Sequence, residues 1–203
     1  MATPSAIALR FQRQELDLKA DLSPAGRTCL AAARGPQDLV TALAGTGNIR
    51  DAINALAFML PHRQVVWWAC LGVRLLPDLA SRGAELAAVE QAELWVQSAA
   101  PADAERAGEI AETCDLHAAP GWTAMAAFWS GPSLAPRGQQ AVPPLPFLPG
   151  VAARTALLLA VHDPALGGRL AAADLLAIGL DLMNGDVGRK AQAAVRERLL
   201  GPA

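Results

Sequence analysis

The spacing of apolar residues along the chain predicts a succession of α-helices. Residues 48–60 show the pattern clearly, because Ile49, Ile53, Leu56 and Leu60 recur at intervals of three or four and would share one helix face. Proline, serine or asparagine opens several of these segments and glycine closes others, as expected at helix ends. The predicted helices cover residues 23–35, 36–45, 48–60, 61–76, 83–100, 101–119, 120–131, 151–163, 167–186 and 187–200.

Two adjacent tryptophans, Trp67 and Trp68, lie in an unbroken run of apolar or small residues from Val65 to Val73. Neighbouring side chains on a helix point about 100° apart. Both indoles can therefore be buried only if the helix is packed on most of its sides. We expect residues 61–76 to form a central helix with both tryptophans in the core, and Gly72 to let another helix approach closely.

Residues 131–150, called the strap below, contain six prolines and have no helical pattern. A loop of this length is uncommon in a compact domain and is usually functional or disordered. Its apolar residues predict that it packs against the bundle in an extended form: Leu134, Val142, Leu145, Phe147 and Leu148. Two interpretations remain open, a purely structural cover over the bundle and a proline-rich segment presented to, or closing over, a partner site.

Composition supports one all-α domain. The chain has 203 residues, of which 53% are hydrophobic and 18% charged, enough material for a core without disulfides. Alanine is abundant, tyrosine is absent and β-branched residues are sparse, which favours helix over strand. We predict a compact multi-helix bundle of antiparallel helices with the strap as an extended segment. Residues 1–22 would be a flexible or loosely docked arm, 23–186 a single helical domain, and 187–203 a short terminal helix or tail.

Net charge and cysteine content limit which cellular compartment and which classes of partner are expected. The net charge of −2 shows no basic surplus for nucleic acid, and the longest apolar run is far shorter than the roughly 20 residues that span a bilayer. The N-terminal residues are too polar for a signal peptide. Cys29, Cys70 and Cys114 are widely spaced and flanked by small apolar residues, which predicts buried, reduced thiols. We therefore expect a cytoplasmic protein.

The histidines are spaced in a way that predicts no metal site. His62, His117 and His162 form no HxxxH or HExxH pattern, and the sequence contains none of the common catalytic or cofactor-binding motifs. His117 and His162 fall near the ends of predicted helices, where a partly cationic imidazole complements the helix dipole. His62 falls near a helix start. We expect no catalytic residue, no cofactor and no metal ligand.

Several motifs together resemble a family of uncharacterised bacterial all-helical proteins. In order, roughly within residues 50–186, they are LPHRQVVWWACLGVR, AELWVQSAAPADAERA, WTAMAAFWSGPSLAP, AVPPLPFLPGVAARTALLLAV and GLDLMNGD. Members often carry an acidic residue and alanine before the valine of the first motif, where this chain has Gln64 and Val65. That departure weakens any role for a carboxylate there. Members of that family look like companions of type VI secretion gene clusters, so the resemblance implies an accessory, adaptor or regulatory protein that binds another protein.

Our leading hypothesis is a non-enzymatic interaction module, an accessory protein of a secretion system. The expected partner-binding residues lie on the strap and on the preceding aromatic helix: Trp122, Trp129, Leu134, Val142, Leu145 and Phe147.

Two other functions stay open. The helices around AELWV and ADAERAGEIAE resemble immunity proteins, which bind and block a toxin. An enzyme is the third possibility, with a site assembled from His62, Arg63, Asp174 and Asp181. A deep polar pocket joining those four residues would favour the enzyme.

Overall fold

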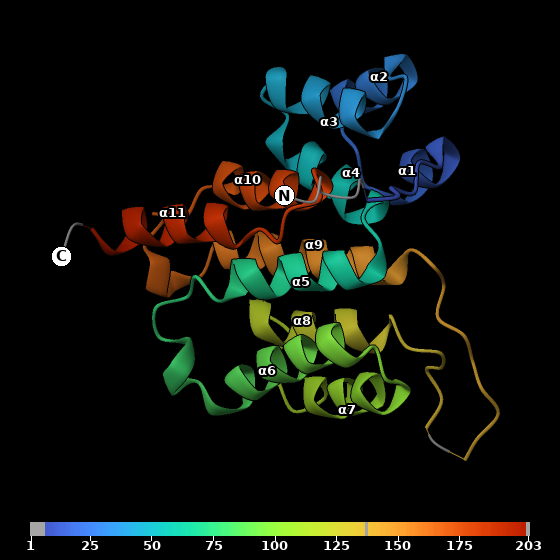
Figure 1. The fold of residues 1–203 in the computed structure, drawn as a ribbon, viewed down its shortest axis with the longest axis vertical. Helices are drawn as coiled ribbons and strands as arrows, with labels where there is room; N and C mark the ends of the chain where they lie inside the picture. The colour runs from blue at the N-terminus through green and yellow to red at the C-terminus, as the bar shows by residue number, and fades with distance from the viewer. Residues whose placement is uncertain (1–6, 137, 202–203) are drawn as a thin grey trace, which may run out of the picture.

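A computed structural model describes residues 7–136 and 138–201 and confirms the all-α prediction (Figure 1). Residues 1–6 of the expected arm, residue 137 of the strap and residues 202–203 of the terminal segment lie outside the described residues. Of the eleven α-helices in the described ranges, only α1 lies outside the predicted segments. The α-helices, with two short 3₁₀ helices η1 and η2, are α1 Arg13–Lys19, α2 Pro24–Ala32, α3 Pro36–Gly45, α4 Ile49–Met59, α5 His62–Val73, η1 Leu79–Ser81, α6 Gly83–Ser98, α7 Pro101–Ala111, α8 Ala119–Phe128, α9 Leu148–Val161, η2 Pro164–Leu166, α10 Ala172–Met183 and α11 Arg189–Leu200.

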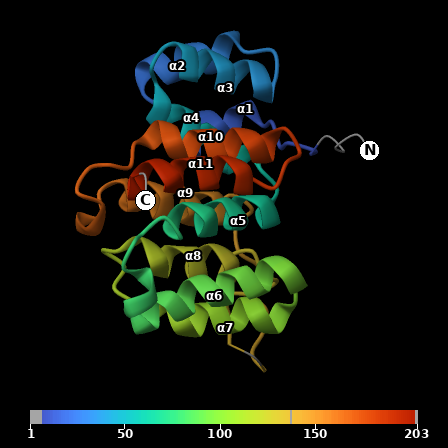
Figure 2. The same ribbon diagram turned by 60° about the vertical axis from the view of Figure 1, so that its left-hand side comes forward.

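The helices are stacked in layers along the long axis of the molecule (Figures 1 and 2). Helices α2 and α3 lie at one end, and α6, α7 and α8 lie at the other. Between them, α9 packs against α4, α5 and α8, so it connects the two halves of the bundle. The strap leaves α8 and returns to α9 at the right of Figure 1, where it projects from the stack.

Helix α5 is central, as its apolar run predicts. Trp68 is completely buried, and its indole N–H donates a hydrogen bond to the Leu175 carbonyl of α10 at 2.8 Å. The prediction for Gly72 is also confirmed. A Cβ atom at that position would lie 2.6 Å from a methyl group of Leu157 on α9, too close for any larger residue without displacement of that side chain.

Trp67 is only partly buried, so the prediction that both tryptophans belong to the core is wrong for this residue. Its indole N–H donates to the Val187 carbonyl at 2.9 Å, and the Arg189 guanidinium lies 4.8 Å above the ring centroid. Trp67 therefore lies at the edge of the core, against the start of α11.

The described part of the expected arm contains α1 and contacts the bundle. Leu16, Ala20 and Leu22 are buried, and the Arg10 backbone N–H donates to the Met59 carbonyl at 2.8 Å. Leu16 is the only buried residue within α1 itself. A seven-residue helix with one core-facing side chain has no repeating pattern, which explains why periodicity did not predict it.

The three cysteines differ in exposure. Cys70 is buried as predicted, and burial raises the pKa of its thiol. Cys29 and Cys114 are partly exposed, so the prediction of buried thiols is wrong for these two. In the described part of the chain, none of the helices has the length and apolar character needed to cross a membrane.

Candidate functional site

The first half of the strap forms a loop that is closed by hydrogen bonds. The Leu134 backbone N–H donates to the Val142 carbonyl at 2.8 Å. The Ser133 hydroxyl accepts from the backbone N–H groups of Ala135 and Val142, at 3.0 and 3.1 Å. Both backbone groups of Val142 are therefore engaged, and the strap is held in place at this residue.

A β-turn ends the strap and leads into α9. The Leu148 N–H donates to the Leu145 carbonyl at 3.0 Å, with Pro146 at the second position of the turn, where proline is favoured. Helix α9 begins at Leu148, so the last three residues of the expected strap are helical. Gly150 permits this close docking, because a Cβ atom there would lie 2.7 Å from the Ala57 carbonyl oxygen of α4.

Two side chains contact the Pro146 carbonyl, one from the N-terminal segment and one from the start of α5. Arg10 Nη1 donates to this oxygen at 2.9 Å, and His62 Nε2 lies 3.1 Å from it. A hydrogen bond from His62 to this carbonyl requires a proton on Nε2. Arg10 Nη1, a donor 3.4 Å from the same nitrogen, would instead require Nε2 to accept, so only one of these two contacts of His62 can be a hydrogen bond. Arg10 also lies 3.5 Å from Glu15.

The apolar strap residues divide into anchored and exposed ones. Phe147 is half-buried and stacks on Phe58, with 6.4 Å between ring centroids and 6° between planes, while Lys19 Nζ lies 5.3 Å from its centroid. Val142 and Leu145 are 52% and 57% exposed.

The prediction that the strap packs down therefore holds only at some positions. Leu134 and Leu148 are partly buried, as is Phe147, but the prediction is wrong for Val142 and Leu145. Val142 and Leu145 each precede a proline, and that neighbour restricts the backbone to extended conformations. The exposed part of the strap consequently spans the two anchored points instead of collapsing onto the helices.

The two predicted tryptophans, Trp122 in α8 and Trp129 directly after its end, contact each other. Trp122 and Trp129 lie edge to face, with 6.2 Å between centroids and 71° between planes, and the Trp122 indole donates to the Leu116 carbonyl at 2.8 Å. Both are partly buried against the core. They lie where the strap departs from α8, and a smaller fraction of each side chain is exposed than for Val142 and Leu145.

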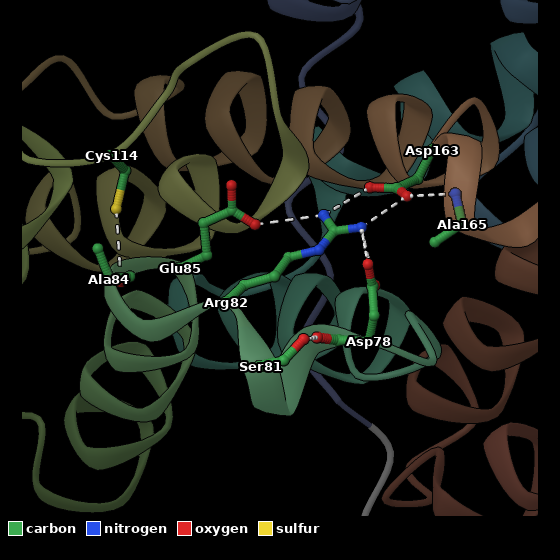
Figure 3. A network of polar contacts seen from close by, with 8 residues as sticks. All are labelled: Asp78, Ser81, Arg82, Ala84, Glu85, Cys114, Asp163 and Ala165. Atoms are coloured by element: carbon green, nitrogen blue, oxygen red, sulfur yellow. Dashed lines mark hydrogen bonds and ion pairs between the residues drawn. The ribbon is translucent and has the colours of Figure 1, made fainter.

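A partly buried ionic network lies elsewhere in the bundle, around Arg82 (Figure 3). The Arg82 guanidinium makes two hydrogen bonds of 2.9 Å to Asp163 and also contacts Glu85 at 3.2 Å and Asp78 at 2.8 Å. The Arg82 hydrogen bonds lower the pKa of Asp163, and those carboxylates raise the pKa of Arg82. Asp163 also accepts from the Ala165 N–H at 3.0 Å, so this network joins the start of α6 to the segment after α9.

A surface pocket of about 590 Å³ adjoins this network and is lined in part by His117 and His162. His162 is the C-cap residue directly after α9, near the helix C-terminus as predicted. His117 lies between α7 and α8, close to the start of α8, so its predicted place at a helix end is wrong. Among the described residues, no group of three or more His, Cys, Asp or Glu side chains is arranged to hold a metal ion. The geometry indicates that Arg82 has a structural role, holding the start of α6 to the segment after α9.

The four residues of the enzyme hypothesis lie at three helix ends, with His62 and Arg63 together at the start of α5. Arg63 donates to the Val96 carbonyl at 2.9 Å, whereas His62 contacts the strap. Asp174 accepts from the Ala171 N–H at 2.8 Å at the start of α10 and pairs with Arg198. Asp181 lies near the end of α10 and is partly buried. Across the described ranges, no hydrogen bond joins any two of the four.

Sequence reasoning missed the residues that position the strap. Arg10 and Pro146 are 136 positions apart, and Lys19 and Phe147 are also far apart in sequence. No local pattern links such residues. The one available signal was the proximity of His62 to Pro61 at a helix start, which places an imidazole at the surface of the bundle.

The burial of His62 beside the strap predicts a measurable dependence of stability on pH. Burial lowers the pKa of His62, a nearby Arg10 acts in the same direction, and the Pro146 hydrogen bond opposes both. The unfolded chain then takes up a proton near pH 6.5, before the folded chain does, so stability falls as pH drops below about 6.5 and levels off below the folded-state pKa. The free energy of unfolding of a His62→Gln variant, from urea titrations between about pH 7.5 and 5, should fall less than that of the wild type. Parallel pH profiles would contradict this account.

Comparison with known proteins identifies one family. The model of DUF6931, a family of unknown function, matches residues 39–183, which include α4 to α10 and the strap. No curated protein and no solved structure matches the chain.

Proposed function

This chain belongs to DUF6931, a family of unknown function, and we propose that it is a non-enzymatic protein-interaction module whose partner binds the exposed part of the strap. The observation that carries the proposal is the exposure of Val142 and Leu145 on a segment whose backbone is held at both sides. Single exposed apolar residues are ordinary on protein surfaces. Two of them, three positions apart on a fixed segment, form a small binding surface.

The anchoring contacts favour binding because they reduce its entropic cost. A free loop loses conformational entropy when a partner orders it, and each side chain that becomes immobile adds to that loss. Here Ser133 and Leu134 hold Val142, while Arg10 and His62 hold Pro146. The bound conformation is in large part present before the partner arrives.

For the partner, we propose a component of a type VI secretion system, met in the cytoplasm by this chain as an accessory protein. The support is the resemblance carried by the WWAC and FWSG motifs and by the proline-rich series that follows. A toxin as the strap-dependent partner would instead identify an immunity protein.

An affinity pull-down from the source organism tests the proposal. Tagged wild type is compared with a Val142→Asp, Leu145→Asp double variant. This variant places charge on the two exposed side chains and leaves the backbone hydrogen bonds of the strap in place. A matched control, Leu94→Asp with Val187→Asp, alters two equally exposed apolar residues elsewhere, 46% and 60% exposed. One protein should be enriched by wild type and control and reduced at least about tenfold with the strap variant, since burying a charge against an apolar site is costly. Equal recovery with all three chains, or no enriched protein, would overturn the proposal.

A further inference from the structure

We propose that the partner recognises the strap through an aromatic-lined groove that accepts a polyproline II helix, with an acidic group facing Lys19. This inference rests on the proposed function and names the kind of partner that the strap fits. The recognised residues are Val142, Pro143, Leu145 and Pro146.

The covalent structure of this segment favours polyproline II geometry. The sequence from Val142 to Pro146 reads VPPLP, and proline restricts φ to about −65°. Val142, Pro143 and Leu145 each precede a proline, which excludes most of the helical region for them. Four consecutive residues are thus biased to the extended conformations that polyproline-binding domains recognise.

The pattern of burial has the period of a polyproline II helix, which has three residues per turn. From Ala141 to Phe147, only Pro144 and Phe147 are partly buried, and the other residues are exposed. Pro144 and Phe147 therefore face the bundle. Val142 and Leu145 are both exposed, and an exposed proline follows each of them; Pro146 belongs to the turn that ends the segment, so the polyproline II part runs from Val142 to Leu145. Two apolar–proline pairs, three residues apart, are presented together.

The backbone of the segment argues against a partner that adds it as a β-strand. Strand addition requires free N–H groups along the peptide. The three prolines between Val142 and Phe147 have none, and the Val142 N–H already donates to Ser133. Leu145 carries the remaining N–H between these two positions. A partner must therefore contact the side chains and proline rings of the segment, as aromatic-lined grooves do.

Charge at one end of the segment indicates a property of the groove. Lys19 is exposed and lies over the Phe147 ring, beside the turn that ends the segment. Arg10, at the same end, is paired with Glu15. The ammonium of Lys19 is thus a cation directly adjacent to the proline segment, and a carboxylate on the partner would complement it.

The test uses the full chain and, as probes, a panel of isolated SH3 domains, which have aromatic grooves flanked by acidic residues. Calorimetric titration should show saturable binding of wild type to at least one domain. Leu145→Ala should weaken that binding about tenfold or more. Lys19→Ala should weaken it severalfold at low salt and have a smaller effect at high salt. Pro136→Ala, an exposed strap proline outside the segment, and Lys190→Ala, the other lysine of the chain, should stay within about twofold of wild type.

The proposal is overturned if no domain saturates the wild type, or if Leu145→Ala binds as well as Pro136→Ala while circular dichroism shows both folded. The protein captured in the pull-down separates this inference from the proposed function. If that protein depends on Val142 and Leu145 but binds a Pro143→Ala, Pro144→Ala variant equally well, the strap is the interaction site and the polyproline groove is wrong. If it depends on neither, both proposals fail.

Discussion

Replacing Trp68 with alanine is expected to lower the free energy of unfolding by about 3–5 kcal/mol, the cost of a large cavity in a closely packed core. Trp68 is completely buried, donates to the Leu175 carbonyl, and fits against Gly179, where a Cβ atom would lie 2.5 Å from its ring. Glycine at 179 leaves room for the indole, so residue 179 has no side chain that could fill the cavity. Urea unfolding followed by circular dichroism measures the change.

The adjacent tryptophan supplies a control. Trp67→Ala removes one hydrogen bond to Val187 and the contact with Arg189, which together predict a loss of about 1–2 kcal/mol. The two variants delete the same side chain from neighbouring positions of one helix, so helix propensity cancels in the comparison. Equal losses for Trp67→Ala and Trp68→Ala would show that α5 is not packed as described.

Replacing Arg82 with alanine is expected to cost a similar amount, about 3–5 kcal/mol, because it leaves a buried carboxylate without its partner. The Asp163 side chain is only 6% exposed and receives two hydrogen bonds from Arg82. Arg106→Ala is the matched control. The Arg106 and Glu109 side chains are 62% and 57% exposed, and loss of such an exposed pair should cost less than about 1 kcal/mol.

The Arg82 variant also has a predicted dependence on pH. The guanidinium lowers the pKa of Asp163, so the stabilisation is present above the unfolded carboxyl pKa of about 3.9 and is lost as pH falls through the lower folded-state value. The difference between wild type and Arg82→Ala should therefore shrink in urea titrations at acidic pH. Adding Asp163→Asn to Arg82→Ala should recover part of the loss at neutral pH, since it removes the unpaired charge. A difference that is independent of pH, or an Asn variant that adds to the loss, would contradict this role.

Ten of the eleven helices in the described ranges, and the identity of the central helix, were determined by the sequence alone. Helices form through hydrogen bonds between residues four apart, so apolar spacing, Pro24 at a helix start and the apolar run around Trp68 contain the necessary information. The absence of helical periodicity around Pro143 and Pro144 likewise predicted an extended segment, because proline limits the local backbone itself.

Only the tertiary structure decided which of these residues are exposed and which distant residues meet. Trp67 and Trp68 have the same local sequence environment, yet α10 buries one and α11 leaves the other partly open. Val142 and Leu145 are exposed because Arg10, His62 and Ser133 hold the strap from three separate parts of the chain. The pairing of Arg82 with Asp163 spans 81 positions. Such contacts depend on how complete helices pack together, and no short stretch of sequence records that packing.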